Sequence, residues 1–93
     1  MELQRDVDAL VKKMGGYWTP SQMLAALMEE VGELADEILA MEGVKGEPSE
    51  EKLREEVGDV LFALACIANY YGIDLEDALM ESIRKYSTRD LQP

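Results

Sequence analysis

Hydrophobic residues recur at steps of three and four along most of the chain, the spacing that places them on one face of an α-helix. Four such stretches predict helices over residues 3–14, 20–41, 49–71 and 74–86, followed by a short tail after Tyr86. The residues that separate them are Gly15 and Gly16, Thr19 and Pro20, 43–49 and 71–74. No segment alternates apolar and polar residues for long, so the predicted fold class is all-α.

The second and third helices are the long ones, and only about seven residues, 43–49, join them. Such a short connection predicts that they fold back as an antiparallel hairpin. The second helix begins with a capping box, in which Thr19 is the N-cap, Pro20 is the first helical residue and Gln22 is the third. Asp74 is the expected N-cap of the fourth helix. The expected core seam consists of Leu24, Leu27, Val31, Leu34 and Ile38 in the second helix and of Leu53, Val57, Val60, Leu64, Ile67 and Tyr71 in the third.

The third helix is apolar without interruption over residues 60–68. A helix that is apolar all round needs neighbours on every side, and a chain of 93 residues has few to offer. We therefore expect one all-α domain over residues 1–93 that completes its helical bundle by oligomerisation.

Composition excludes several classes of function. The chain has 20 Asp plus Glu against 9 Lys plus Arg, a net charge of −11, so binding to a nucleic-acid polymer is not expected. It has no histidine, which excludes histidine-dependent nucleophiles and histidine-ligated zinc. Cys66 has no partner for a disulfide, which favours a reducing, cytoplasmic location. Neither a signal peptide nor an apolar run of about 20 residues is found, so no membrane association is expected.

An acidic near-repeat is the most informative feature. Glu-Glu-Val-Gly-Glu-Leu at 29–34 returns as Glu-Glu-Val-Gly-Asp-Val at 55–60, in the arms of the predicted hairpin. Helical residues three apart reach a common point, so Glu30 pairs with Glu33 and Glu56 with Asp59. Four converging carboxylates would repel one another unless a cation lay between them. Mg²⁺, or Mn²⁺ in its place, is the expected ion, and Mg²⁺ typically takes its remaining ligands from a phosphate substrate.

A plainer interpretation is that the acidic stretches are exposed helix surface, because Glu is a strong helix former. The matched glycines Gly32 and Gly58 argue against it, since Gly costs about 1 kcal/mol relative to Ala inside a helix. Close approach by a neighbouring helix or by a ligand is the expected reason for both glycines.

The two motifs, Glu29-Glu30-x-x-Glu33 and Glu56-x-x-Asp59, resemble those of the MazG-type nucleotide pyrophosphohydrolases of the all-α NTP pyrophosphatase superfamily. The resemblance covers most of the chain. It implies Mg²⁺-dependent hydrolysis of a nucleoside triphosphate to the monophosphate and pyrophosphate by a homodimer or homotetramer. It also implies that Glu30, Glu33, Glu56 and Asp59 are the metal ligands. The carboxylate that activates water would then be Glu29 or Glu33.

The substrate-side residues implied by the resemblance are Trp18, Gln22, Asn69, Lys85 and Arg89. The Trp-x-x-x-Gln spacing of Trp18 and Gln22 is similar to a family segment that contacts the nucleotide, although a Trp beside a helix start is often a packing residue. Lys85 and Arg89 match a Lys-aromatic-x-x-Arg segment and would neutralise the triphosphate, or they would only complement the C-terminal end of their helix. Asn69 would recognise the sugar or base.

Two other functions stay open at this point. The first is a non-catalytic acidic helical module that binds metal or a basic protein. The second, within the superfamily, is a phosphoribosyl-ATP pyrophosphohydrolase, for which a histidine is expected after the second motif, and this chain has none. The resemblance implies a role in removing aberrant nucleotides or in controlling a nucleotide pool, and the first of these is favoured.

Overall fold

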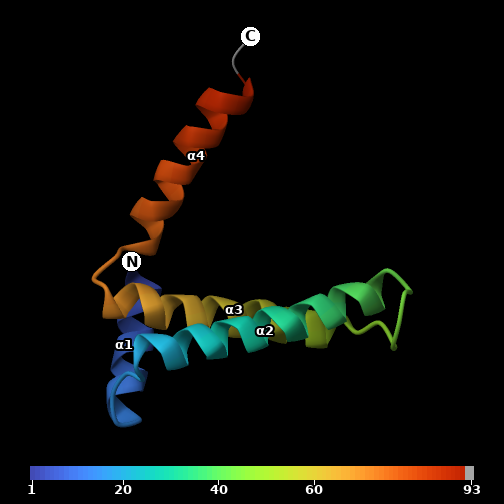
Figure 1. Cartoon of the computed structure of the whole chain (residues 1–93), viewed down its shortest axis with the longest axis horizontal. Coiled ribbons are helices and arrows are strands. Elements are labelled where there is room, and N and C mark those ends of the chain that lie inside the picture. The colour runs from blue at the N-terminus through green and yellow to red at the C-terminus, as the bar shows by residue number, and fades with distance from the viewer. Residues whose placement is uncertain (92–93) are drawn as a thin grey trace.

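The computed structural model describes residues 1–91. They form four α-helices, which confirms the all-α fold class: α1 (Glu2–Lys13), α2 (Pro20–Met41), α3 (Glu50–Tyr70) and α4 (Leu75–Leu91). The long helices α2 and α3 pack side by side and are joined by a loop at the far end of the molecule (Figure 1). The predicted hairpin is therefore present.

The predicted helix starts are confirmed by their hydrogen bonds. The Thr19 hydroxyl accepts from the backbone N–H of Gln22 at 3.3 Å, and the Gln22 side chain accepts from the backbone N–H of Thr19 at 3.0 Å. Ser49 accepts from the backbone N–H of Lys52, and Asp74 from that of Asp77. Each of these contacts satisfies an N–H group that the helix itself leaves without a partner.

The predicted end of the last helix is wrong. Instead of giving way to a tail after Tyr86, α4 continues to Leu91. No Gly or Pro lies between residues 73 and 92 to stop it. The cations of Lys85 and Arg89 lie 4.7 and 4.8 Å from the centre of the Tyr86 ring, and such contacts support the added turns.

The remaining helices lie at one end of the hairpin. α1 packs against α3, whereas α4 leaves the end of α3 at a bend of 103° and extends away from the hairpin (Figure 1). The radius of gyration is 15.9 Å, whereas about 12 Å is expected for a compact chain of this length. The single chain is therefore an open arrangement of helices.

The buried face of α2 differs from the predicted seam. Leu24, Val31 and Ile38 of that seam are 55%, 39% and 44% exposed. The residues of α2 that are buried or half-buried from Met23 onward are Met23, Ala26, Leu27, Glu30, Leu34, Glu37 and Ala40. The prediction counted only apolar residues, but the half-buried stripe includes the carboxylates of Glu30 and Glu37. Three of the five predicted seam residues therefore face outward.

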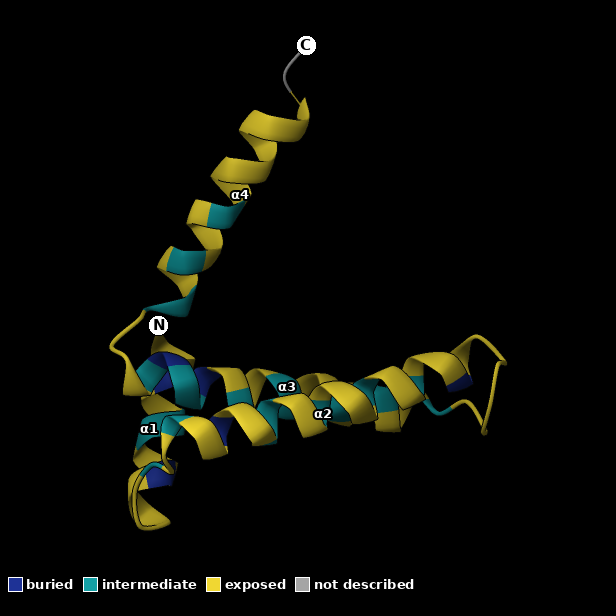
Figure 2. Ribbon diagram, in the orientation of Figure 1, coloured by how far each residue is buried: buried dark blue, intermediate teal, exposed yellow. Residues whose placement is uncertain are grey.

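The hydrophobic core within residues 1–91 is small. Its fully buried hydrophobic members are Val11, Met23, Ala40, Ala65 and Ala68. Along α4, Leu79, Ile83 and Tyr86 are all about half exposed or more, and most of the helix surface is exposed in Figure 2. These uncovered apolar faces are what an oligomeric bundle would bury, and the oligomer stays a prediction.

The buried side-chain amide of Gln4 links the helices that meet at one end of the hairpin. Gln4 of α1 is 6% exposed, and its Nε2 donates to the Asn69 Oδ1 at 3.0 Å and to the Ile73 carbonyl at 2.9 Å. Its Oε1 accepts from the backbone N–H of Leu75 at 2.8 Å. One side chain thus joins α1, the end of α3 and the first residue of α4.

Within residues 1–91 no single helix is long and apolar enough to cross a membrane, and only α3 and α4 together, bent by 103°, reach that length and composition.

Replacing Gln4 by Ala should lower the free energy of unfolding by about 2–3 kcal/mol, because the Leu75 N–H and the Asn69 amide lose a buried partner. Urea denaturation followed by circular dichroism measures the difference. Asp6→Ala, at an exposed position of the same helix, is the matched control and should change stability by less than about 0.5 kcal/mol. Equal stability of the two variants would contradict the role assigned to Gln4.

Candidate functional site

Three carboxylates from the two arms of the hairpin meet midway along it. Glu30 and Glu33 extend from successive turns of α2 and Glu56 extends from α3, and an oxygen of each lies within 4.8 Å of an oxygen of the other two. Glu30 and Glu56 are half-buried, while Glu33 is exposed. The structure therefore brings together three of the four predicted metal ligands.

Two oxygens of this cluster have no partner. Within the described chain, Oε2 of Glu30 and Oε2 of Glu56 are buried and accept no hydrogen bond. An unpartnered buried carboxylate oxygen is costly, and a cation bound to it removes that cost. Oxygen-only donors of this kind match the preference of Mg²⁺ and Mn²⁺. The residues present therefore fit the expected ion.

The electrostatics of the cluster favour a bound positive charge. Burial raises the pKa of Glu56 to about 7, helped by a hydrogen bond with Glu30 and by repulsion from Glu33, Glu30 and Asp59. Burial is also the main cause of the raised pKa of Glu30, with repulsion from Glu33, Asp59 and Glu29 added to it. The contact between the two carboxyl groups adds to the rise in the pKa of Glu56 and partly offsets the rise at Glu30. A proton and a cation would therefore compete for the same oxygens.

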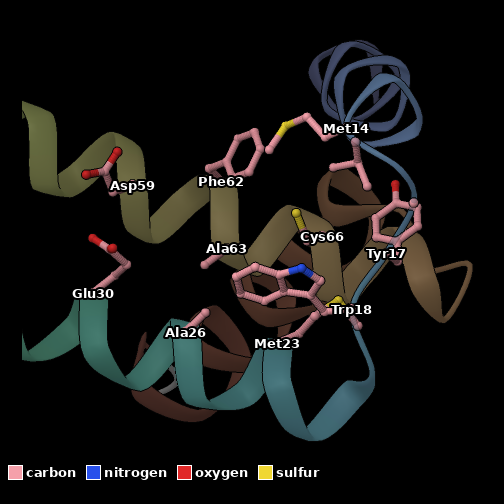
Figure 3. A pocket seen from close by; sticks show the side chains of 12 residues that line it. Met14, Tyr17, Trp18, Met23, Ala26, Glu30, Asp59, Phe62, Ala63 and Cys66 are labelled. Carbon is pink, nitrogen blue, oxygen red and sulfur yellow. The ribbon is translucent and has the colours of Figure 1, made fainter.

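A pocket of about 360 Å³ opens beside the cluster. Glu30 and Asp59, the fourth predicted ligand, form its acidic end, as Figure 3 shows. The rest of the lining is largely apolar or aromatic and consists of Val11, Met14, Gly16, Tyr17, Trp18, Met23, Ala26, Phe62, Ala63 and Cys66. The pocket therefore offers metal-binding oxygens at one end and an apolar surface at the other.

Trp18 lies between this pocket and a second hollow. Its ring crosses the pocket in Figure 3, and the residue is 63% exposed. The second hollow, of about 260 Å³, is lined by Trp18, Gln22, Ala25, Ala26 and Glu29. Gln22 and Glu29 thus lie near Trp18 but outside the larger pocket. Gln22 also uses its side-chain oxygen in the capping box.

Asn69 lies at the far end of α3, where its amide is engaged by other residues. Its Nδ2 donates to the Gln4 carbonyl at 2.9 Å and to the Tyr17 hydroxyl at 3.1 Å, and its Oδ1 accepts from Gln4. Both amide hydrogens are therefore already donated within the chain. Contact between Asn69 and a substrate stays a prediction.

Lys85 and Arg89 are not brought to the acidic cluster of their own chain. They lie on α4, which extends away from the hairpin (Figure 1), and both cations lie over the Tyr86 ring. Arg89 also pairs with Asp90 at 2.8 Å. The role of both cations at the acidic site stays a prediction.

Several pocket residues were not singled out from the sequence. Phe62, Ala63 and Cys66 follow Asp59 by three, four and seven positions, so one face of α3 carries them all, and this spacing was the signal available. Tyr17 comes from the α1–α2 loop, where helical spacing gives no signal. Met14 is the last residue of the helix predicted over 3–14, and it is the C-cap of α1 in the structure.

The two motif glycines are not explained by the hairpin itself. A Cβ atom added at Gly32 or Gly58 would meet no atom of the described chain within 4 Å. The expectation of close approach by a neighbouring helix is thus not met within one chain. Close approach by a ligand stays a prediction.

Residues 18–92 match the family model described as the MazG nucleotide pyrophosphohydrolase domain, a segment that contains all the predicted site residues. The chain belongs to the MazG family. It is accordingly a nucleotide pyrophosphohydrolase, an enzyme that hydrolyses a phosphoanhydride bond, which excludes the non-catalytic module.

Two relatives of similar length come from one organism. The uncharacterized protein YpjD of Bacillus subtilis (strain 168) is 41% identical, over 96% of this chain and 84% of its own length. The uncharacterized protein YvdC of the same organism is 36% identical, over 77% of this chain and 79% of its own length. Both similarities cover most of each protein.

Two crystal structures share the fold. A Bacillus-conserved MazG protein, described as a nucleotide pyrophosphohydrolase, superimposes with a TM-score of 0.82 at 42% identity, covering 96% of this chain and 89% of that one. The putative pyrophosphatase YpjD from Bacillus subtilis superimposes with a TM-score of 0.84 at 38% identity, covering 91% of each chain.

The raised pKa of Glu56 predicts how the metal-free MazG chain responds to pH. The folded state keeps a proton up to about pH 7 that the unfolded state releases near 4.5, so this stabilising contribution is complete below 4.5 and is lost as the pH rises to 7. In chelator, the melting temperature should therefore fall over this range, and Glu56→Gln should flatten the fall. Adding Mg²⁺ or Mn²⁺ should raise the melting temperature more at pH 8 than at pH 5.

Glu55→Gln is the control, because Glu55 is exposed and adjacent in sequence but outside the cluster. It should keep the pH dependence of the natural chain. A Glu56→Gln melting profile parallel to that of Glu55→Gln would show that Glu56 does not carry the effect.

Proposed function

We propose that this MazG protein hydrolyses nucleoside or deoxynucleoside triphosphates to the monophosphate and pyrophosphate, with Mg²⁺ as cofactor and Mn²⁺ as a substitute. One observation carries the proposal: the cluster of Glu30, Glu33 and Glu56, with two unpartnered buried oxygens, borders an apolar pocket that suits a nucleoside. A triphosphate has the same division into an anionic end and an aromatic end.

Glu30, Glu33, Glu56 and Asp59 would hold the metal. When bound, the ion orients the phosphates, stabilises their developing charge and makes a bound water more acidic. The carboxylates themselves keep the ion at the acidic end of the pocket and so determine which phosphates meet the attacking water.

Glu29 or Glu33 would accept the proton of that water. Both are exposed, so either can pass the proton on to solvent. The water oxygen attacks the α-phosphorus, the α–β anhydride bond breaks, and pyrophosphate leaves with the bonding electrons. No covalent intermediate is required.

The apolar part of the pocket would receive the nucleoside. Trp18 offers a ring face on which a base can stack, and its large exposure means that the free protein leaves this face open. Gln22 lies beside Trp18 and is proposed to contact the nucleotide from the second hollow. We keep Asn69 as a further candidate for the sugar or base.

Lys85 and Arg89 are proposed to neutralise the triphosphate of another subunit. Their helix extends away from its own hairpin, and its apolar face is uncovered (Figures 1 and 2). A homodimer or homotetramer would bury that face against another chain and bring cations to its acidic site. Removal of aberrant nucleotides in the cytoplasm is the proposed role.

Phosphorus NMR with a panel of ribo-, deoxy- and oxidised nucleoside triphosphates tests the reaction. Monophosphate and pyrophosphate should form with Mg²⁺ and cease to form with chelator. Glu56→Gln and Asp59→Asn should each lower turnover by about 100-fold or more while helicity is kept, because each removes a charged metal ligand. Glu55→Gln is the control and should keep full turnover.

Persistent triphosphate across the panel, with folded and metal-supplied protein, would refute the proposed substrate class. Diphosphate plus orthophosphate would show that a different anhydride bond is broken.

Mixing of subunits tests whether Lys85 and Arg89 act at the site of another chain. Glu56→Gln chains and Lys85→Ala/Arg89→Ala chains should each be inactive alone. Co-expressed chains should recover about a quarter of the natural activity, since half of randomly formed dimers are mixed and each mixed dimer has one intact site. Activity of the double variant alone would remove both cations from the mechanism, and inactive mixed dimers would place them with their own chain's site.

A further inference from the structure

One wall of the pocket is formed by a loop that contains two successive glycines and no regular secondary structure. Met14, Gly16, Tyr17 and Trp18 all line the pocket and all belong to the short connection between α1 and α2. Gly15 and Gly16 have φ values of 108° and 106°, in the region that favours glycine. Two successive glycines leave the unfolded loop many conformations, so something must hold it in this one.

The Tyr17 hydroxyl anchors this loop to two helices. It donates to Oδ1 of Asp8 in α1 at 2.6 Å, and it accepts from Nδ2 of Asn69 in α3 at 3.1 Å. The donor and acceptor roles are unambiguous, since a carboxylate only accepts and the amide nitrogen only donates. The hydroxyl therefore acts both as a donor and as an acceptor.

The two partners of Tyr17, Asn69 and Asp8, each make a further contact that positions them. The second Nδ2 hydrogen of Asn69 is donated to the Gln4 carbonyl, an acceptor only, which determines the orientation of the amide. Gln4 is buried and also bonds the start of α4. On the other side, Oδ2 of Asp8 pairs with Lys12 at 2.9 Å. The pocket loop thus rests on a network that reaches both α1 and the α3–α4 turn.

Ionisation preserves this arrangement at neutral pH. Lys12 and then Tyr17 lower the pKa of Asp8, so it remains a carboxylate that accepts. Burial and the Asp8 carboxylate raise the pKa of Tyr17, so its hydroxyl keeps the proton that it donates.

We propose that Tyr17 is a positioning residue, whose hydroxyl, held between Asp8 and Asn69, keeps the 14–18 loop in place as the pocket wall and so presents Trp18 to the nucleoside. In this role Asn69 acts through Tyr17, and the role does not depend on contact between Asn69 and the substrate. The nucleoside part of this inference rests on the proposed function, whereas the placement of Trp18 does not.

A held loop has a defined kinetic consequence. If Trp18 is already in place, substrate binding does not have to order the glycine-containing loop. The affinity for substrate is then greater, because the free-energy cost of ordering that loop is not charged to binding. The effect belongs to substrate binding and not to the reacting phosphates, which lie at the acidic end of the pocket. Loss of the anchor should therefore raise KM and leave kcat nearly unchanged.

Tyr17→Phe tests this with the loss of one oxygen. The chain has one tryptophan, so acrylamide quenching of its fluorescence reports on Trp18 alone. Tyr17→Phe should increase the quenching constant and raise KM for the best triphosphate about three- to tenfold, the size of one net hydrogen bond. kcat should stay within about twofold. Tyr71→Phe, at a 58% exposed tyrosine outside the pocket, is the matched control and should change none of these values.

A second pair of variants keeps the test decisive if Tyr17→Phe folds poorly. Asp8→Ala removes the hydroxyl's acceptor, and Lys12→Ala removes only the ion pair on the other carboxylate oxygen. Asp8→Ala should reproduce the rise in KM and quenching, and Lys12→Ala should not.

Unchanged quenching and KM in folded Tyr17→Phe would overturn the inference, even if its melting temperature fell, since the hydroxyl would then serve stability alone. Equal effects of Asp8→Ala and Lys12→Ala would overturn it as well. If the natural protein hydrolyses no triphosphate, the proposed function fails, while the quenching measurements still decide whether Tyr17 places Trp18.

Discussion

Carboxylates that face one another across the α2–α3 hairpin are the constraint on which the rest of this structure depends. Glu30 and Glu56 are half-buried, and each has a buried oxygen with no partner. Lost hydration, together with repulsion among the carboxylates, raises the pKa of Glu56 to about 7, so a bound positive charge would stabilise the ionised site. A helical hairpin built only for stability would place apolar residues at these positions.

The acidic stripe has consequences for the packing elsewhere. Because carboxylates occupy part of the buried face of α2, apolar residues such as Leu24 and Val31 remain exposed, and the core of the single chain stays small. The end of the hairpin is held instead by a polar network centred on Gln4 and Asn69. That network also supports the loop that carries Trp18, so the same bonds that stabilise the helix junction shape the apolar end of the pocket.

Much of the local structure could be predicted from the sequence, and some of the site as well. Helix starts at Thr19 and Ser49 follow from capping chemistry, which acts within four residues. The convergence of Glu30, Glu33 and Glu56 follows from helical spacing and a short loop. The end of α4 could not be predicted, because the exposed turns of this helix carry weak stop signals. The orientation of the α2 seam could not be predicted either, because a seam chosen from apolar residues alone leaves out the carboxylates that are half-buried.

The sequence by itself determined the four helices, the acidic chemistry and the resemblance that the MazG family match confirms, since these depend on neighbours along the chain and on motif spacing. Only the tertiary structure decided that Asn69 bonds Gln4 and Tyr17, that Tyr17 and Cys66 line the pocket, and that Lys85 and Arg89 lie away from their own acidic cluster. The physical reason is distance along the chain. Residues 17 and 69, or 4 and 75, meet only after the helices have packed, and no local pattern encodes that meeting.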